Sequence, residues 1–95
     1  EPMAFHRRML GYAPTPLVAA PGIAAELGLE ALWVKDESER MSLPAFKIVG
    51  ASWAVYRAVG AALHERTGEA IGAWGSLDEL TARLEPLKPL TLTCA

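Results

Sequence analysis

The spacing of apolar and polar positions changes along the chain, and the first clear pattern is a short helix. Pro21 suits the first turn of this helix, and Gly28 suits its C-terminal cap. Between them, Ile23, Ala24 and Leu27 share one face at helical spacing. The pattern therefore predicts a single amphipathic helix of about two turns in this segment.

The segments on either side of this helix are predicted to be extended or irregular. We expect residues 1–16 to form an irregular lead-in, because Pro14 and Pro16 lie close together and restrict the backbone. A short apolar run predicts a strand over about residues 31–35, and charged residues follow it. A polar loop is expected over residues 38–44.

The most extensive pattern predicts a long helix from about residue 45 to about residue 66. The helix would be apolar nearly all round, so we expect it to be buried on several sides. Gly50 and Gly60 would each weaken it by about 1 kcal/mol relative to alanine, which suggests close approach of another backbone there. Its large apolar residues at helical spacing are Phe46, Val49, Trp53, Tyr56, Val59 and Leu63.

The last third of the chain predicts one more helix and one more strand. Ser76 and Glu79 form a capping box at the start of the helix, and Pro86 ends it. Residues 90–95 predict a buried strand. A strand, a crossover helix and a second strand favour parallel pairing, so the predicted fold class is α/β.

Composition and charge exclude several classes of protein. The 95 residues allow one domain at most, and 52% of them are hydrophobic, which excludes a disordered tail. The formal net charge of −2 and the lack of a basic cluster argue against a nucleic-acid partner. No apolar run is long enough to span a membrane. A single cysteine excludes a disulfide framework, so we expect a reducing, cytoplasmic environment.

Both ends of the sequence lead us to expect a piece of a longer polypeptide. The chain opens on Glu1 rather than on a methionine, and it closes inside the apolar, β-branched run of residues 90–95. We therefore treat residues 1–95 as one N-terminal region whose partner is the remainder of its own polypeptide.

Lys47 is the most notable candidate for chemistry. It is predicted to lie one turn inside the long helix, beside Phe46. The positive end of the helix dipole and an apolar neighbourhood both disfavour an ammonium ion, and a neutral amine is the form that makes Schiff bases. A surface lysine whose stem covers apolar side chains is the alternative interpretation.

Three sequence motifs resemble those of the fold-type II enzymes that use pyridoxal phosphate (PLP), the relatives of tryptophan synthase β and threonine dehydratase. The first is Thr15-Pro16-Leu17, the second is Trp33-Val34-Lys35-Asp36-Glu37-Ser38, and the third is Ala45-Phe46-Lys47-Ile48-Val49-Gly50-Ala51. The resemblance implies that Lys47 forms the Schiff base with PLP and that Phe46 lies beside the cofactor. It also implies a three-layer architecture around a parallel sheet, of which this chain is an incomplete part.

Within that superfamily, the order and spacing of the motifs most resemble the diaminopropionate ammonia-lyases. Ser42 and Pro44 depart from the glycine and asparagine typical of that group, which leaves the exact substrate open. The resemblance implies a lyase that deaminates a small amino acid to a 2-oxo acid and ammonia, commonly as a homodimer. A serine or threonine dehydratase is the alternative, and the substrate-selecting residues are expected beyond Ala95.

The other candidate sites are weaker. Ser52 resembles a nucleophile elbow but lacks the final glycine and falls inside the predicted helix. Asp36 and Glu37 could be acid–base groups, but a carboxylate pair at the end of a strand is more often a cap or a salt bridge. No metal site is expected, because His6, His64 and Cys94 lack ligand spacing. A non-catalytic α/β interaction fragment is the alternative to an enzyme segment.

Overall fold

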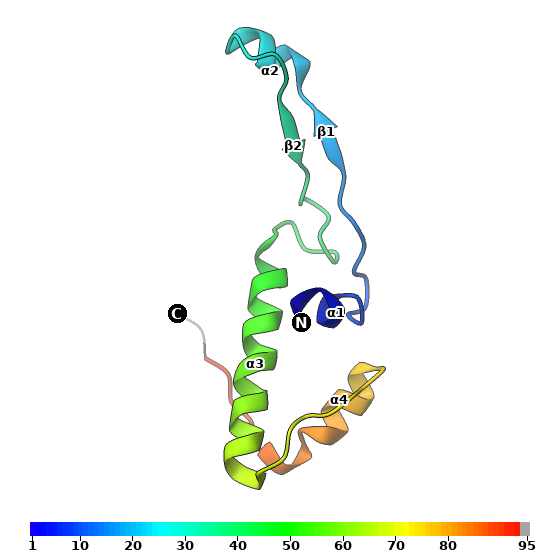
Figure 1. The fold of residues 1–95 in the computed structure, drawn as a ribbon, viewed down its shortest axis with the longest axis vertical. Helices are drawn as coiled ribbons and strands as arrows, with labels where there is room; N and C mark the ends of the chain where they lie inside the picture. Colours follow the sequence, from blue (N-terminus) through cyan, green and yellow to red (C-terminus); the bar gives the residue numbers. More distant parts are fainter. Residues whose placement is uncertain (94–95) are drawn as a thin grey trace.

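The computed structural model describes residues 1–93 and divides them into a packed lobe and an extended arm (Figure 1). The lobe is built around one long helix, and the arm is a β-hairpin that projects from it. The radius of gyration is 18.5 Å, whereas a compact chain of this length would have about 12 Å. The principal extents of 58 × 29 × 21 Å confirm that the molecule is elongated.

The arm consists of β1 (Leu17–Ala19), α2 (Pro21–Glu26) and β2 (Trp33–Lys35). The two strands pair antiparallel, with Val18 opposite Val34. Helix α2 follows the prediction closely, because Gly28 adopts a left-handed φ of 67° just past its end. Two backbone hydrogen bonds, from Gly28 to Ala25 and from Leu29 to Ala24, complete a Schellman cap.

The lobe consists of α1 (Pro2–His6), α3 (Lys47–Thr67), α4 (Leu77–Arg83) and the 3₁₀ turn η1 (Glu85–Leu87). Helix α3 is the predicted long helix and begins two residues later than expected. It ends at Gly68, whose φ of 77° allows its N–H to donate to the His64 carbonyl at 2.7 Å. The serine half of the predicted capping box is present at α4, since Ser76 Oγ accepts from the Glu79 N–H at 3.2 Å. The Glu79 carboxylate reaches back one residue further than predicted and accepts from the Gly75 N–H at 2.7 Å.

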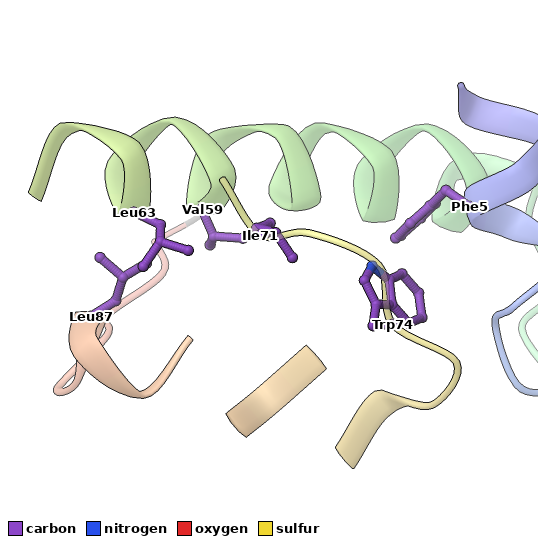
Figure 2. Packing of buried hydrophobic residues seen from close by; sticks show 6 residues of the cluster. All are labelled: Phe5, Val59, Leu63, Ile71, Trp74 and Leu87. Atoms are coloured by element: carbon purple, nitrogen blue, oxygen red, sulfur yellow. The ribbon is translucent and has the colours of Figure 1, made fainter. Parts of the chain in front are cut away.

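A small hydrophobic core lies between α3 and the segments that cover one of its faces (Figure 2). Aromatic rings make up much of it: the ring centroid of Phe5 lies 4.7 Å from that of Tyr56 and 5.9 Å from that of Trp74. The Trp74 indole donates to the Tyr56 hydroxyl at 3.3 Å. The buried members are Phe5, Val59, Leu63, Ile71, Trp74 and Leu87.

Two predictions about the backbone were wrong, and one strand pair was not predicted. The lead-in is not irregular throughout, because Pro2 opens α1 and Phe5 anchors this helix on α3. The unpredicted pair is antiparallel, because the chain before Pro21 runs back along β2 and forms β1. Residues 90–93 form no strand, since no other strand lies beside them, and the rest of the predicted strand at 90–95 lies outside the described residues.

The predicted burial of α3 on several sides was also wrong for this part of the chain. Only Val59 and Leu63 of the helix are buried, because α1, residues 71–74 and η1 cover one face. A Cβ on Gly60 would lie 3.2 Å from the Ile71 side chain, so a side chain, and not the predicted backbone, packs closely against that glycine. A Cβ on Gly50 would meet nothing within 4 Å, so close approach does not explain that one here.

Candidate functional site

Lys47 is the first residue of α3, and its side chain is exposed. Phe46 occupies the N-cap with helical dihedral angles (φ −68°, ψ −15°), and no side chain caps the helix there. Among residues 1–93, the Lys47 ammonium makes no hydrogen bond and no ion pair. The side chain therefore lies at the positive end of the helix dipole and is open to approach from solvent.

The apolar neighbourhood expected around Lys47 is not found within the described residues. The Phe46 side chain is 66% exposed, so it does not desolvate the amine. Lys47 also stands at the start of α3 and not one turn inside it, because Pro44 and the bend that follows it delay the helix.

The loop before Lys47 has an unusual backbone. Met41 and Ser42 adopt left-handed φ values of 53° and 61°, which cost side-chain-bearing residues about 1 kcal/mol each. The Leu43 N–H donates to the Arg40 carbonyl at 3.0 Å and closes this tight turn. The turn directs the chain from Arg40 toward the start of α3.

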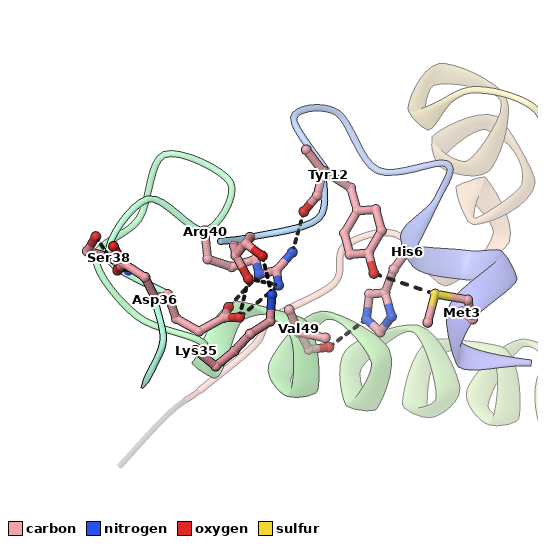
Figure 3. A network of polar contacts seen from close by, with 11 residues as sticks. Met3, His6, Tyr12, Lys35, Asp36, Ser38, Arg40 and Val49 are labelled. Atoms are coloured by element: carbon pink, nitrogen blue, oxygen red, sulfur yellow. Dashed lines mark hydrogen bonds and ion pairs between the residues drawn. The ribbon is translucent and has the colours of Figure 1, made fainter. Parts of the chain in front are cut away.

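Arg40 is the centre of a polar cluster at the joint between the arm and the lobe (Figure 3). Its side chain is buried, and its Nε donates to Glu37 Oε2 at 2.6 Å while Nη2 donates to Glu37 Oε1 at 2.9 Å. The remaining donors reach across to the lead-in, to the Ala13 carbonyl at 2.6 Å and to Thr15 Oγ1 at 3.0 Å. This guanidinium therefore holds two segments of chain together, the loop of residues 37–40 and the lead-in, with the bidentate geometry that suits arginine.

The charges in this cluster are matched. Hydrogen bonds from Arg40 and from the Thr15 hydroxyl, the latter at 2.5 Å, lower the pKa of Glu37 from 4.5 to about 2. The same carboxylate raises the pKa of Arg40. The ammonium of Lys35 donates to the Thr15 carbonyl and adds a further tie between the arm and the lead-in.

Asp36 and Glu37 form a turn cap and a salt bridge, which is the alternative to an acid–base pair given by the sequence. The Asp36 carboxylate accepts from the Ser38 N–H at 3.0 Å and from the Ser38 hydroxyl at 2.6 Å, and these bonds lower its pKa. They form an Asx turn just after β2. Glu37 is occupied by its salt bridge with Arg40.

A second polar contact reaches the first turn of α3 from α1. His6 is buried and its Nε2 lies 2.7 Å from the Val49 carbonyl oxygen, so Nε2 carries the donated proton. The His6 ring stacks on Tyr12, with centroids 5.8 Å apart and an interplanar angle of 20°. The Arg40 guanidinium lies over the other ring of this stack, 5.4 Å from the Tyr12 centroid.

The remaining candidates gain no support. Ser52 lies within α3 and donates to the Val49 carbonyl at 3.2 Å, which is the position of a helical serine and not of a nucleophile elbow. Within residues 1–93 there is no group of three or more His, Cys, Asp or Glu side chains that could hold a metal. No helix in the described part is long and apolar enough to cross a membrane. Cys94 lies outside the described residues.

Sequence reasoning missed Arg40 and His6. Arg40 follows Glu37 by three residues, a spacing that signals a local ion pair, but its ties to Ala13 and Thr15 join segments more than 20 residues apart. Nothing in the sequence near His6 signals a contact with Val49, because the two residues are 43 positions apart.

Comparison with curated proteins finds relatives that share part of this chain. The chain is 45% identical over 51 residues to the diaminopropionate ammonia-lyase of Escherichia coli strain K12. These aligned residues are 54% of this chain and 13% of that protein. It is 46% identical over 55 residues to the diaminopropionate ammonia-lyase of Salmonella typhimurium. These aligned residues are 58% of this chain and 14% of that protein.

No family model matches the chain, and no solved structure matches it. The segment shared with the curated relatives spans about one seventh of the length of those proteins. What the comparisons establish is partial similarity to proteins named diaminopropionate ammonia-lyase, and the structure adds a mixed helix and strand segment compatible with part of an α/β fold.

Proposed function

We propose that this chain is a segment of a PLP-dependent ammonia-lyase and that Lys47 is its cofactor-bearing residue. The observation that carries the proposal is the 45% identity over 51 residues to a diaminopropionate ammonia-lyase. The exposed, unpaired amine of Lys47 among residues 1–93 supports it, because an aldehyde can reach that amine without breaking an existing contact. PLP, when bound, supplies the electron sink for reactions at the Cα of an amino acid.

The residues in this chain suit a part of that task. Lys47 would hold the cofactor covalently, and its released amine would then take the proton from the substrate Cα. Phe46 precedes it with an exposed ring that can pack beside a planar ligand. The groups that hold the phosphate and the pyridine nitrogen belong, in this proposal, to the remainder of the polypeptide.

The proposal extends to the architecture and the surroundings. The apolar faces of α3 and of the arm would pack against the remaining polypeptide in a three-layer α/β fold with a parallel sheet. The substrate would be a small amino acid such as 2,3-diaminopropionate, and the products a 2-oxo acid and ammonia. A homodimer and a cytoplasmic location remain predictions.

The experiment is an assay of the whole protein that contains this chain. Purified protein with added PLP should release ammonia from 2,3-diaminopropionate, and Lys47→Ala should lower the rate by at least about 1,000-fold, in line with the loss of a covalent and acid–base group. Lys88→Ala, which changes an exposed lysine paired with Glu85, is the matched control and should keep full activity.

The same assay separates the alternatives. If the protein releases ammonia from serine or threonine in preference to diaminopropionate, the assigned activity changes from diaminopropionate ammonia-lyase to serine or threonine dehydratase. Absence of activity together with absence of PLP binding would contradict the enzyme assignment and favour a non-catalytic interaction segment.

A further inference from the structure

Three contacts in series connect the polar cluster around Arg40 with the first turn of α3 (Figure 3). The Arg40 guanidinium lies over Tyr12, the Tyr12 ring stacks on His6, and His6 donates to the Val49 carbonyl. Val49 is the third residue of the helix that Lys47 begins. The series therefore ends within the same helical turn as the proposed cofactor-bearing lysine.

The start of α3 needs such support because its own sequence supplies little. No side chain caps the helix, although the first four N–H groups of any helix lack partners within it. The loop before it contains two residues in left-handed conformations, which store strain next to the first turn. His6 does not satisfy those N–H groups, because it donates to the Val49 carbonyl, but it ties the first turn of α3 to α1. His6 is only 5% exposed, so little water competes for that hydrogen bond.

The other end of the series is rigid. The four hydrogen bonds of the Arg40 guanidinium, two of them to Glu37, fix its plane and its position. A fixed cation over an aromatic ring attracts the ring, so Arg40 restricts where Tyr12 can lie. Tyr12 in turn covers one face of the His6 ring and limits its orientation.

We propose that Arg40 is a positioning residue that acts through Tyr12 and His6 to hold the first turn of α3, the turn that carries Lys47. The consequence for catalysis rests on the proposed function, but the mechanical role does not. No contact between Arg40 and Lys47 is involved. The effect travels through the ring stack and the hydrogen bond to Val49.

Tyr12 offers the sharpest test, because it lies outside the hydrophobic core and a conservative control exists. Tyr12→Leu removes the ring from the series, whereas Tyr12→Phe keeps the ring and removes only a hydroxyl that donates to the Met3 sulfur at 3.5 Å. The measurement is amide hydrogen exchange along α3 in the full chain. The reporting amides belong to Ala51, Ser52 and Trp53, which donate to the carbonyls of residues 47–49 in a regular helix.

In Tyr12→Leu these three amides should exchange about tenfold faster, a local opening, while the amides of residues 61–63 keep their rates. Tyr12→Phe should match the wild-type chain. His6→Ala should repeat the Tyr12→Leu pattern, and His6→Gln should partly restore protection, because its side-chain amide can also donate to the Val49 carbonyl. Unchanged rates in Tyr12→Leu, or an equal increase along the whole of α3, would overturn the proposal.

A second readout separates this inference from the proposed function. In the whole protein with PLP, Tyr12→Leu should lower kcat more than it raises KM, since the lysine is misplaced while the substrate site is intact. If the wild-type protein shows no PLP chemistry, the proposed function fails. The exchange pattern still decides whether the contacts through Tyr12 and His6 hold the helix.

Discussion

The arm and the lobe are both rich in apolar residues, yet within residues 1–93 every buried apolar side chain except Ala24 lies in the lobe. In the lobe, Trp74 is 4% exposed and Leu63 is 4% exposed, because α1, residues 71–74 and η1 all cover the same face of α3. In the arm, Trp33 is 59% exposed and Leu17 is 61% exposed, since a two-stranded sheet has no second layer. An isolated hairpin is marginal in water, so the arm depends on its connection to the lobe.

The comparison shows that an apolar pattern predicts which face of an element should be buried. The pattern does not identify the segment that packs against that face. The arm and the lobe meet at the polar cluster around Arg40, and not through an apolar interface. This cluster ties the ends of the arm to the loop that leads to Lys47. The joint is therefore the place where the two regions affect each other.

The largest expected effect contrasts the two regions with the same substitution. Trp74→Ala should lower the free energy of unfolding by about 3 kcal/mol, because it removes a buried ring from the aromatic core. Trp33→Ala should change it by less than about 0.5 kcal/mol, because that ring is largely exposed. Denaturant unfolding of both variants measures the difference. Equal losses would contradict the division into a packed lobe and an uncovered arm.

A second prediction uses the two helix glycines to locate the covered face of α3. Gly50→Ala should raise the free energy of unfolding by about 1 kcal/mol, because the position is open and alanine is the better helix former. Gly60→Ala should gain less, since its Cβ would lie 3.2 Å from the Ile71 side chain. Thermal unfolding of the pair provides the measurement, and a larger gain at Gly60 would be inconsistent with this packing.

Features of the fold that depend on neighbouring residues could be predicted from the sequence, whereas features that depend on contacts between distant residues could not. The long helix, the C-terminal cap at Gly28 and the serine N-cap at Ser76 follow from local spacing and local chemistry, and the structure confirms them. Helix α1 was missed because Phe5 is held by rings about 50 residues away. The hairpin was missed because its strands are three residues each and are linked through α2.

The candidate site divides in the same way. Lys47 was singled out from neighbouring residues, but it begins α3 and does not lie one turn inside the helix as predicted. The contacts that fix its surroundings, from Arg40 to Ala13 and from His6 to Val49, are long-range and leave no local pattern. The role of Lys47 and Phe46 in binding a cofactor remains a prediction.

A smaller effect concerns the strained loop at the joint. Ser42→Gly should raise the free energy of unfolding by about 0.5 kcal/mol, because glycine adopts the φ of 61° without steric cost but loses more entropy on folding. Ser38→Gly, in the same loop but without a positive φ, is the matched control and should be destabilising, since it removes the hydroxyl bond to Asp36. Thermal unfolding compares the two, and a loss of stability in Ser42→Gly would contradict the strained turn.

The pH dependence of the joint follows from the lowered pKa of Glu37. A folded-state pKa of about 2 against 4.5 in the unfolded chain means that Glu37 stabilises the fold fully above about pH 4.5. That contribution declines as the pH falls from 4.5 and is lost below about 2. A carboxyl carbon NMR titration should give the low midpoint, and Arg40→Ala should move it upward. A wild-type midpoint near 4.5 would show that the Arg40 contact is absent in solution.

The central claim is that Lys47 bears the cofactor, and borohydride reduction of the whole protein with bound PLP tests it most directly. Reduction converts the lysine–cofactor linkage into a stable bond, and peptide mass spectrometry then locates the added mass. The account predicts the label on Lys47 and none on Lys35 or Lys88, which serve as internal controls within the same chain. A label on another lysine, or no label in a protein that has been shown to fold, would contradict it.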